Sequence, residues 1–430
     1  MNHKLKADLM NVGYSKATIT PMSGVHRLAG YIQRTKPSIC VLDDIYVKTI
    51  VYELEQGNLL VMSSVDLLAI DEAMVNDMRR VVKEITGSQE IIVAATHTHS
   101  APSTLFRDAT PAMPIIEFNE DYYQYFLSSF EKSLQEAYNG VEKAKCTATT
   151  LSVQGIATNR NNPSIPIDNN VTVLKCNGNR VKVGVINYGV HPTVLGPDNV
   201  CISRDLVGVT EDLLRMESGV DFVFINAAAG DVSTRFTRRN QTYNEVIRIG
   251  TLLANNIING MGSAQWREIE GFSLYKNSKL INLEFDVKKV ESISSELFMK
   301  LKLVKSHDAG YSRVAESIKE ALDAIKLIQE SIYRKRSASI MITAYLIDQR
   351  LGLIVFPGEA LSKIALNCRE LAATEIIFAG YANGYYGYFS DKTIPETYED
   401  LMTIFTEKSV RDVYSSVMNL CSWIGELASS

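Results

Sequence analysis

The chain has 430 residues, of which 46% are hydrophobic and 22% are charged, and its formal net charge is -5 with a pI near 5.8. This composition is ordinary for a globular protein with a large core, and the absence of a basic stripe argues against a nucleic-acid partner. The length fits two or three domain-sized units or one elaborated catalytic domain.

The N-terminal stretch MNHKLKADLMNVGYSKATITP lacks the apolar segment of a signal peptide. No window reaches the roughly 18 apolar residues that a membrane span requires. Six cysteines lack C-x-x-C spacing, and in a chain of this length free thiols are favoured over a disulfide framework. These cysteines are Cys40, Cys146, Cys176, Cys201, Cys368 and Cys421. We therefore expect a cytoplasmic protein, or a secreted one if a leader has been trimmed.

Strands and helices are expected to alternate along the chain, which indicates the α/β class. Short β-branched and aliphatic runs predict strands near residues 45–52, 59–68, 90–96, 181–190, 221–229, 351–358 and 374–382. Amphipathic stretches predict helices over residues 70–86, 119–140, 244–260, 291–336 and 406–427. The sequence His307-Asp308-Ala309-Gly310 is expected to divide the fourth of these into a helical hairpin.

Two histidine motifs follow predicted strands. In IIVAATHTHSAPS, an extended backbone would point His97 and His99 to the same side. In NYGVHPTVLG, His191 ends a buried run and Pro192 stops the strand. Imidazole is a common zinc ligand and a general base near neutral pH, although a solvated loop or a structural histidine fits each motif alone. Together they predict one site, because clefts in α/β folds form where strands end.

Two further motifs carry a candidate nucleophile and a candidate ligand. FINAAAGDVSTRF presents Ser233 after small residues that permit close backbone approach, although a helix-capping serine explains this turn equally well. IVFPGEALSKIAL places Glu359 after a Pro-Gly turn, as a metal ligand or as an acid in the first turn of a helix. Five tyrosines interleaved with glycines follow over residues 378–401.

Six motifs occur in a fixed order, namely THTHSAPS, NRNNP, GVHPTVLG, AAAGDVS, FPGEA and GYANGYYGY…YED. As an ordered set they resemble the neutral/alkaline (non-lysosomal) ceramidase family, specifically its catalytic N-terminal domain, over residues 18–425. The resemblance implies a mixed β-sheet core with flanking helices and the active site at strand ends. It also implies a single catalytic domain over residues 1–430, with the hairpin around 291–336 as an insertion.

Members of this family are zinc-dependent amidases that cleave the N-acyl bond of ceramide. The resemblance implies that His97, His191 and Glu359 bind zinc and that Tyr388 completes the coordination. Two imidazoles and one carboxylate are a common catalytic zinc set with an open position. A set of histidine, glutamate and tyrosine also admits iron or manganese.

The remaining active-site residues follow from the same motifs. His99 matches a histidine that faces the substrate, Arg160 an arginine that contacts it, and Ser233 the residue assigned as nucleophile. Tyr398 matches a second active-site tyrosine if a two-residue deletion precedes it. Arg160 and the tyrosines would stabilise the developing oxyanion. Attack by Ser233 and attack by zinc-bound water both remain open.

The sequence departs from the family at loops that face the substrate. Secreted ceramidases carry a signal sequence and a C-terminal immunoglobulin-like domain, which this sequence lacks. Residues 101–104 replace a glycine-rich turn, and Thr234 replaces a proline. Three nearby arginines, Arg235, Arg238 and Arg239, suggest a smaller, more polar N-acyl substrate, such as an acylated amino sugar or amino acid.

Two other functions fit the same residues. A zinc esterase or lactonase would use the same carbonyl chemistry, and a binding protein could keep the fold without activity. The partner expected in each case is a small molecule, with no nucleic acid and no transmembrane segment.

Overall fold

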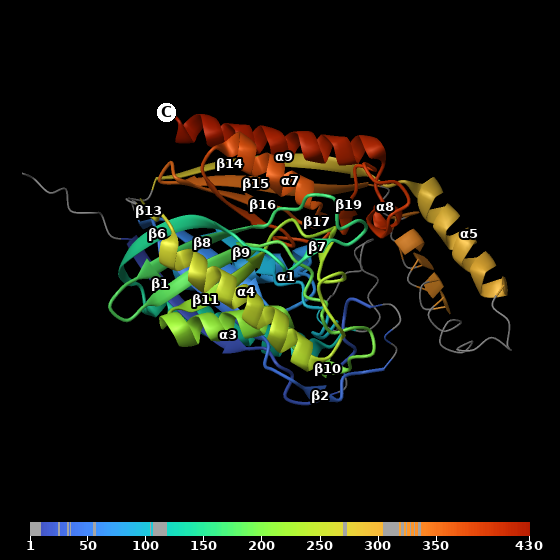
Figure 1. The fold of residues 1–430 in the computed structure, drawn as a ribbon, viewed down its shortest axis with the longest axis horizontal. Helices are drawn as coiled ribbons and strands as arrows, with labels where there is room; N and C mark the ends of the chain where they lie inside the picture. Colours follow the sequence, from blue (N-terminus) through green and yellow to red (C-terminus); the bar gives the residue numbers. More distant parts are fainter. Residues whose placement is uncertain are drawn as a thin grey trace, which may run out of the picture.

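The molecule is a four-layer sandwich, with two β-sheets packed face to face and helices covering both outer faces (Figure 1). The computed structural model describes residues 10–24, 26–31, 34, 36–54, 57–103, 105, 118–269, 273–303 and 337–430, together with part of 318–333. This arrangement confirms the predicted α/β class with a mixed sheet and flanking helices.

The first sheet is parallel at its two ends and antiparallel between them. Its order is β11 (Asp221–Asn226), β9 (Lys182–Tyr188), β8 (Asn170–Asn177), β6 (Glu142–Ser152), β1 (Met10–Thr18), β3 (Tyr46–Glu53), β4 (Leu59–Val65) and β5 (Ile91–Ala95), with β13 (Arg267–Ile269) beside β6. The strands predicted here are confirmed. The sequence patterns missed β1, β6 and β8, which mix polar and apolar residues.

The second sheet is smaller and also mixed. Its order is β14 (Leu274–Glu284), β15 (Ser337–Ile347), β16 (Leu351–Val355) and β18 (Glu375–Ala379). Three two-residue pairs lie outside both sheets: β2 (Cys40–Val41) with β10 (Cys201–Ile202), β7 (Thr158–Asn159) with β12 (Val232–Ser233), and β17 (Glu359–Ala360) with β19 (Tyr388–Phe389).

Helices cover each outer face because the apolar side of each helix packs against the apolar outer face of a sheet. The first sheet is covered by α1 (Glu72–Thr86), α2 (Glu120–Asn139), α3 (Leu206–Ser218) and α4 (Tyr243–Ser263). The second is covered by α7 (Ser362–Ala372) and α9 (Glu407–Ala428) (Figure 1). Helix α1 begins and ends within two residues of its predicted bounds. At its start the Asp71 carboxylate accepts from the Met74 N–H, and Gly87 ends it in the left-handed conformation.

The predicted helical hairpin is seen in part. Helix α5 (Val287–Leu303) projects from the sandwich, and the described residues between 318 and 333 are helical (Figure 1). The proposed break at His307 to Gly310 lies outside the described residues. Organisation as one domain with this insertion remains a prediction. A short helix, α8 (Tyr398–Met402), lies near the ends of the strands of the second sheet.

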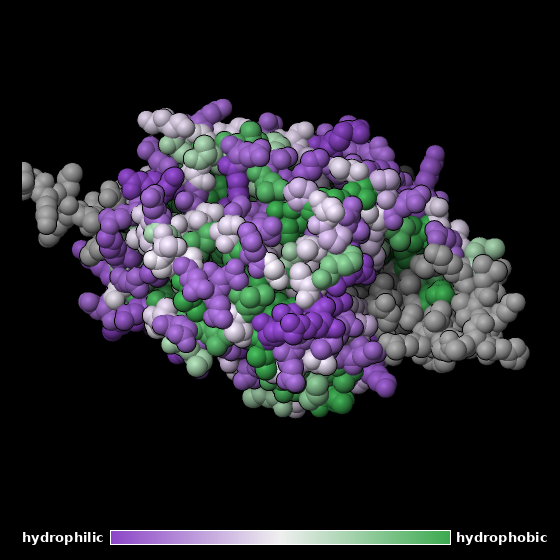
Figure 2. All heavy atoms as spheres, in the orientation of Figure 1, coloured by the Kyte–Doolittle hydropathy of each residue, from purple (hydrophilic) through white to green (hydrophobic). Residues whose placement is uncertain are grey.

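Three buried clusters form the core. One lies between the sheets, where Ile50 and Met62 of the first sheet pack with Leu353 and Ile377 of the second. The other two lie between each sheet and its helices. On the face drawn in Figure 2, hydrophilic residues predominate and hydrophobic atoms occur in small groups. In the described part of the chain, no helix combines the length and apolarity needed to cross a bilayer.

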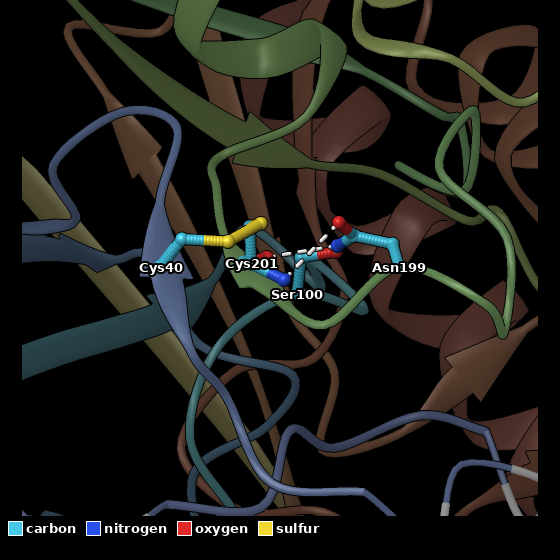
Figure 3. The surroundings of a disulfide bond; sticks show 4 residues. All are labelled: Cys40, Ser100, Asn199 and Cys201. Atoms are coloured by element: carbon cyan, nitrogen blue, oxygen red, sulfur yellow. Dashed lines mark hydrogen bonds between the residues drawn. A yellow bond between two sulfur atoms is a disulfide. The ribbon is translucent and has the colours of Figure 1, made fainter.

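The expectation of free thiols is wrong, because all six cysteines are paired. Cys146 and Cys176 lie opposite each other on β6 and β8, and Cys368 of α7 is bonded to Cys421 of α9. Cys40 and Cys201 join β2 to β10, and Asn199 links the latter strand to Ser100 (Figure 3). Chain length and spacing could not reveal these pairs, since strand register and helix packing create them.

We expect no reactive thiols in the unfolded, unreduced protein and six after reduction. Thiol titration in guanidinium with and without reductant measures this directly. A Cys40→Ser/Cys201→Ser variant should lose about 2–5 kcal/mol of unfolding free energy, because that disulfide closes a loop with a sequence separation of 161. Six thiols before reduction would contradict the pairing.

Candidate metal centre and active site

Two loops at strand ends of the first sheet bring three histidines together. His97 and His99 follow β5, and His191 follows β9. The Nε2 atoms of His97 and His99 are 3.4 Å apart. The extended geometry predicted for this pair is wrong, because His97 has a φ of 67° and lies in the left-handed region. The convergence itself was predicted, and such strain in a non-glycine residue is typical of functional sites.

The second sheet supplies the carboxylate and a phenol. Glu359 and Tyr388 are direct neighbours in the parallel pairing of β17 with β19. Glu359 Oε2 lies 3.2 Å from His191 Nε2 and 3.5 Å from His97 Nε2. Tyr388 Oη lies 3.5 Å from His191 Nε2. The structure therefore brings together all four residues for which metal binding was predicted.

Buried amides hold the strand ends around the site together, both between the two sheets and within the first sheet. The Asn187 side chain donates to the Phe378 carbonyl at 2.9 Å and accepts from the Phe378 N–H at 2.8 Å. The Asn226 side chain donates to Thr96 O at 3.0 Å, next to His97. Gly380 completes the contact, because a Cβ there would lie 2.6 Å from Ala227 O. These contacts fix the histidine loops relative to Glu359.

Hydrogen bonds to backbone carbonyls orient the imidazoles of His97 and His191, the two predicted histidine ligands. Nδ1 of His97 lies 2.7 Å from Leu68 O, and Nδ1 of His191 lies 2.7 Å from Ala229 O. Each Nδ1–H therefore donates to a carbonyl, which leaves the Nε2 lone pair facing the other ring. Burial lowers the pKa of each of these histidines to about 3, so both are neutral at physiological pH.

This donor set fits a metal ion. His97, His99 and His191 each offer a nitrogen within 4.8 Å of the others, and the Glu359 carboxylate lies against two of them. Neutral imidazoles packed with lone pairs facing one another are satisfied by a cation between them. Nitrogen and carboxylate ligands of this kind suit zinc, iron or manganese.

Two tyrosines that the sequence analysis did not single out hold Glu359. Tyr385 Oη donates to Oε1 of Glu359, and Tyr381 Oη lies 3.5 Å from Oε2. The Tyr381 ring also stacks on His97 with centroids 4.1 Å apart. The dense tyrosines of residues 378–401 were the available signal, but only the fold shows which of them reach the carboxylate.

Arg160 approaches the same Nε2 atom of His191 that Glu359 and Tyr388 approach. Its Nη1 lies 3.4 Å from His191 Nε2, and its Nη2 donates to Tyr388 Oη at 3.1 Å. Its Nε donates to Glu399, a fully buried carboxylate that also accepts from Asn161 Nδ2 at 2.8 Å. Burial alone would lower the pKa of Arg160, but Tyr388 and Glu399 outweigh it and hold that pKa above its ordinary value. The sequence analysis missed Glu399, although it adjoins Tyr398.

Tyr398 and Ser233 border the site in different ways. The Tyr398 side chain is half-exposed, and its ring lies 5.7 Å from that of Tyr388 and 5.4 Å from Arg160 Cζ. Ser233 lies beside His191 through backbone pairing, and its Oγ accepts from the Arg235 N–H at 3.2 Å. Catalytic roles for both residues remain predictions.

A family model for neutral/alkaline non-lysosomal ceramidase, N-terminal, matches residues 10–243, which is more than half of the chain. The chain belongs to the neutral/alkaline non-lysosomal ceramidase family. This confirms the resemblance drawn from the six motifs. Glu359 and Tyr388 lie beyond the matched segment, in the part of the chain where the second sheet supplies the site.

Two solved ceramidases share the fold. The neutral ceramidase from Pseudomonas aeruginosa superimposes with a TM-score of 0.74 at 18% identity, over 98% of this chain and 75% of that one. A ceramidase complexed with C2 gives a TM-score of 0.72 at 17% identity, over 97% of this chain and 75% of that one. At these identities the likeness is one of fold.

The metal-free protein should lose stability as the pH falls from about 6.5 towards 3. In this window the unfolded chain binds protons at His97 and His191, whose ordinary pKa is near 6.5, whereas the folded chain does not. Burial raises the pKa of Asp205 to about 6, which acts in the opposite direction with a smaller shift. Thermal denaturation of chelator-treated protein as a function of pH measures the net effect of these groups on stability. A His97→Gln/His191→Gln variant should show a weaker pH dependence, and an equal one would contradict the assignment.

Proposed function

We propose that the protein is a zinc-dependent hydrolase that cleaves an N-acyl amide bond. The observation that carries this proposal is the convergence of neutral His97 and His191 with Glu359 at the strand ends of a ceramidase-family fold. The Tyr388 hydroxyl, 3.5 Å from His191 Nε2, supports a role for this residue in completing the coordination. Bound zinc would polarise the amide carbonyl and make a nucleophile available at neutral pH.

The side chains around the metal site have separate roles in this proposal. Arg160 brings a guanidinium next to His191 and Tyr388, where it would donate hydrogen bonds to the oxygen that gains negative charge. Tyr398 lies at the rim and orients the substrate. His99 turns its Nε2 towards His97 Nε2 at 3.4 Å, so in this proposal it faces the substrate or the water at the metal.

The nucleophile is either Ser233 or a water molecule. Ser233 is nearly buried and adjoins His191, which supports a role close to the reacting carbonyl. A covalent acyl-serine would accumulate as a burst of amine release in the first turnover, whereas attack by water gives none. Rapid-mixing measurements on the wild type and on Ser233→Ala separate the two routes.

We place the protein in an oxidising compartment, against the cytoplasmic expectation. Disulfides persist in secreted, periplasmic and cell-surface proteins and are rare in the cytosol. Three of them here join distant segments of the chain. The pairing of all six cysteines supports this location.

Hydrolysis of matched amide and ester substrates tests the proposed reaction. Purified protein that contains near-stoichiometric zinc should cleave N-acyl amides and lose this activity with a chelator. If the protein cleaves only esters, it is an esterase or lactonase and the proposal of amide hydrolysis is wrong. Absence of both activities in zinc-loaded protein would leave a binding protein of this fold.

A further inference from the structure

Arg34 carries a buried positive charge next to the histidines. Its side chain is 4% exposed, and its guanidinium contacts only carbonyl oxygens among the described residues: Nη1 donates to Ala29 O at 3.0 Å and to His99 O at 2.6 Å, and Nη2 reaches Gly196 O at 3.4 Å. Its Nε–H has no partner within the described part of the chain. Burial lowers the pKa of Arg34 to about 10, which leaves it charged at neutral pH.

A buried cation without a countercharge is unfavourable, so this arrangement requires an explanation. No carboxylate in the described part of the chain pairs with Arg34. Asp205, which acts electrostatically on the neighbouring Tyr31, already accepts backbone N–H groups of Val194, Leu195 and Leu206 at 3.3, 2.9 and 2.7 Å. Its charge therefore stabilises the loop after His191 and not the guanidinium.

Two unpartnered polar atoms flank Tyr31. The ring of Tyr31 lies 4.9 Å from the His99 ring and 4.9 Å from Arg34 Cζ, and its hydroxyl donates to Leu195 O at 2.9 Å. Among the residues that the structure describes, neither Arg34 Nε nor His99 Nδ1 has a hydrogen-bond partner. Both atoms can donate hydrogen bonds, so both are completed by an acceptor with oxygen atoms.

Arg238 adds a second positive charge to the same place. Its guanidinium donates to the carbonyl of Thr193, in the loop that Tyr31 also contacts, and it acts electrostatically on Tyr31 together with Arg34. It is half-buried and pairs with no carboxylate among the described residues. The Arg34, Tyr31 and Arg238 side chains, called here the arginine subsite, thus adjoin the metal site at His99.

We propose that the arginine subsite binds an oxyanion of the substrate, close to the scissile amide. The inference rests on the proposed N-acyl hydrolysis and narrows its substrate class to N-acyl amino acids or similar amides that carry a carboxylate or sulfonate. An oxyanion supplies the missing countercharge and accepts from the free donors. Ceramide has no such group and is expected to be a poor substrate.

A matched pair of amides tests the proposal. N-lauroylglycine and N-lauroylglycinamide differ only in the charged group, and N-lauroyltaurine carries a sulfonate on a chain one methylene longer. The wild type should prefer the anionic compounds by about 10–100-fold in kcat/KM, the range expected for hydrogen bonds to a charged group. Arg238→Gln should raise KM for the anionic compounds more than for the neutral amide, and Arg34→Gln, which also loses its hydrogen bond to His99 O, should lower the ratio of kcat/KM between the anionic and neutral compounds. Arg34→Lys, which keeps the charge, should retain part of the preference.

Controls separate this inference from folding defects and from the proposed function. Arg411→Gln removes an exposed arginine of α9 and should change nothing, and thermal unfolding shows whether each variant folds. Cleavage without anionic preference, or equal losses on both substrates in folded Arg238→Gln, would overturn the arginine subsite alone. If no amide is cleaved, the proposed function fails, and calorimetric measurement of the affinities for the same two amides still tests the arginine subsite. Equal affinities would overturn the subsite. Tighter binding of the anionic amide that is lost in Arg34→Gln would support it.

Discussion

Replacing Glu359 with glutamine is expected to release the metal and abolish hydrolysis. The substitution keeps the size of the side chain but removes the negative charge that faces His97 and His191. Loss of an outer-shell partner already lowers metal affinity by about 10–100-fold, so loss of a direct ligand should lower it further. Metal content after dialysis, measured by mass spectrometry, is the primary readout, with amide hydrolysis as the second.

Glu370→Gln is the matched control, because it removes an exposed carboxylate from α7, the helix that follows Glu359 in the chain. This variant should bind metal like the wild type. Tyr385→Phe removes one hydrogen bond to Glu359 and should show an intermediate loss of metal affinity. Retention of stoichiometric metal by Glu359→Gln would contradict the assigned ligand set.

Arg160→Met should lower kcat by about 10²–10³-fold while the metal stays bound. Methionine fills much of the same space but cannot donate to a developing oxyanion or to Tyr388. Glu399→Gln should give a smaller loss, because Glu399 acts through Arg160 and touches no reacting group in this proposal. Arg160→Lys keeps the charge but cannot bridge Tyr388 and Glu399 at once, so it should restore little activity.

A double-mutant cycle distinguishes positioning from general structural damage. If Glu399 works by orienting Arg160, then Glu399→Gln in the Arg160→Met background should cause little additional loss of kcat. Metal content and thermal unfolding serve as controls for both variants. Fully additive losses, or loss of metal in Arg160→Met, would show that the pair does not act as a unit in catalysis.

Much of the site could be predicted because its residues lie in short, local motifs. His97 and His99 are two positions apart, and His191 and Glu359 each follow an apolar run that forms a buried strand. Contacts between segments that lie apart in the chain could not be predicted from such motifs. Tyr381 and Tyr385 lie between β18 and β19 and reach Glu359 because β19 pairs with β17, and Glu399 reaches Arg160 across 239 positions of the chain.

The sequence by itself determined the α/β class, the positions of the strands with continuous apolar runs, the family and the identity of the candidate ligands, because apolar periodicity and motif order are properties of local sequence. Only the tertiary structure decided the pairing of two sheets into four layers, the three disulfides and the surroundings of Arg34. These features depend on strand register and on contacts between segments far apart in the chain. Local side-chain patterns do not encode them, since the free energy that selects them comes from packing the whole core.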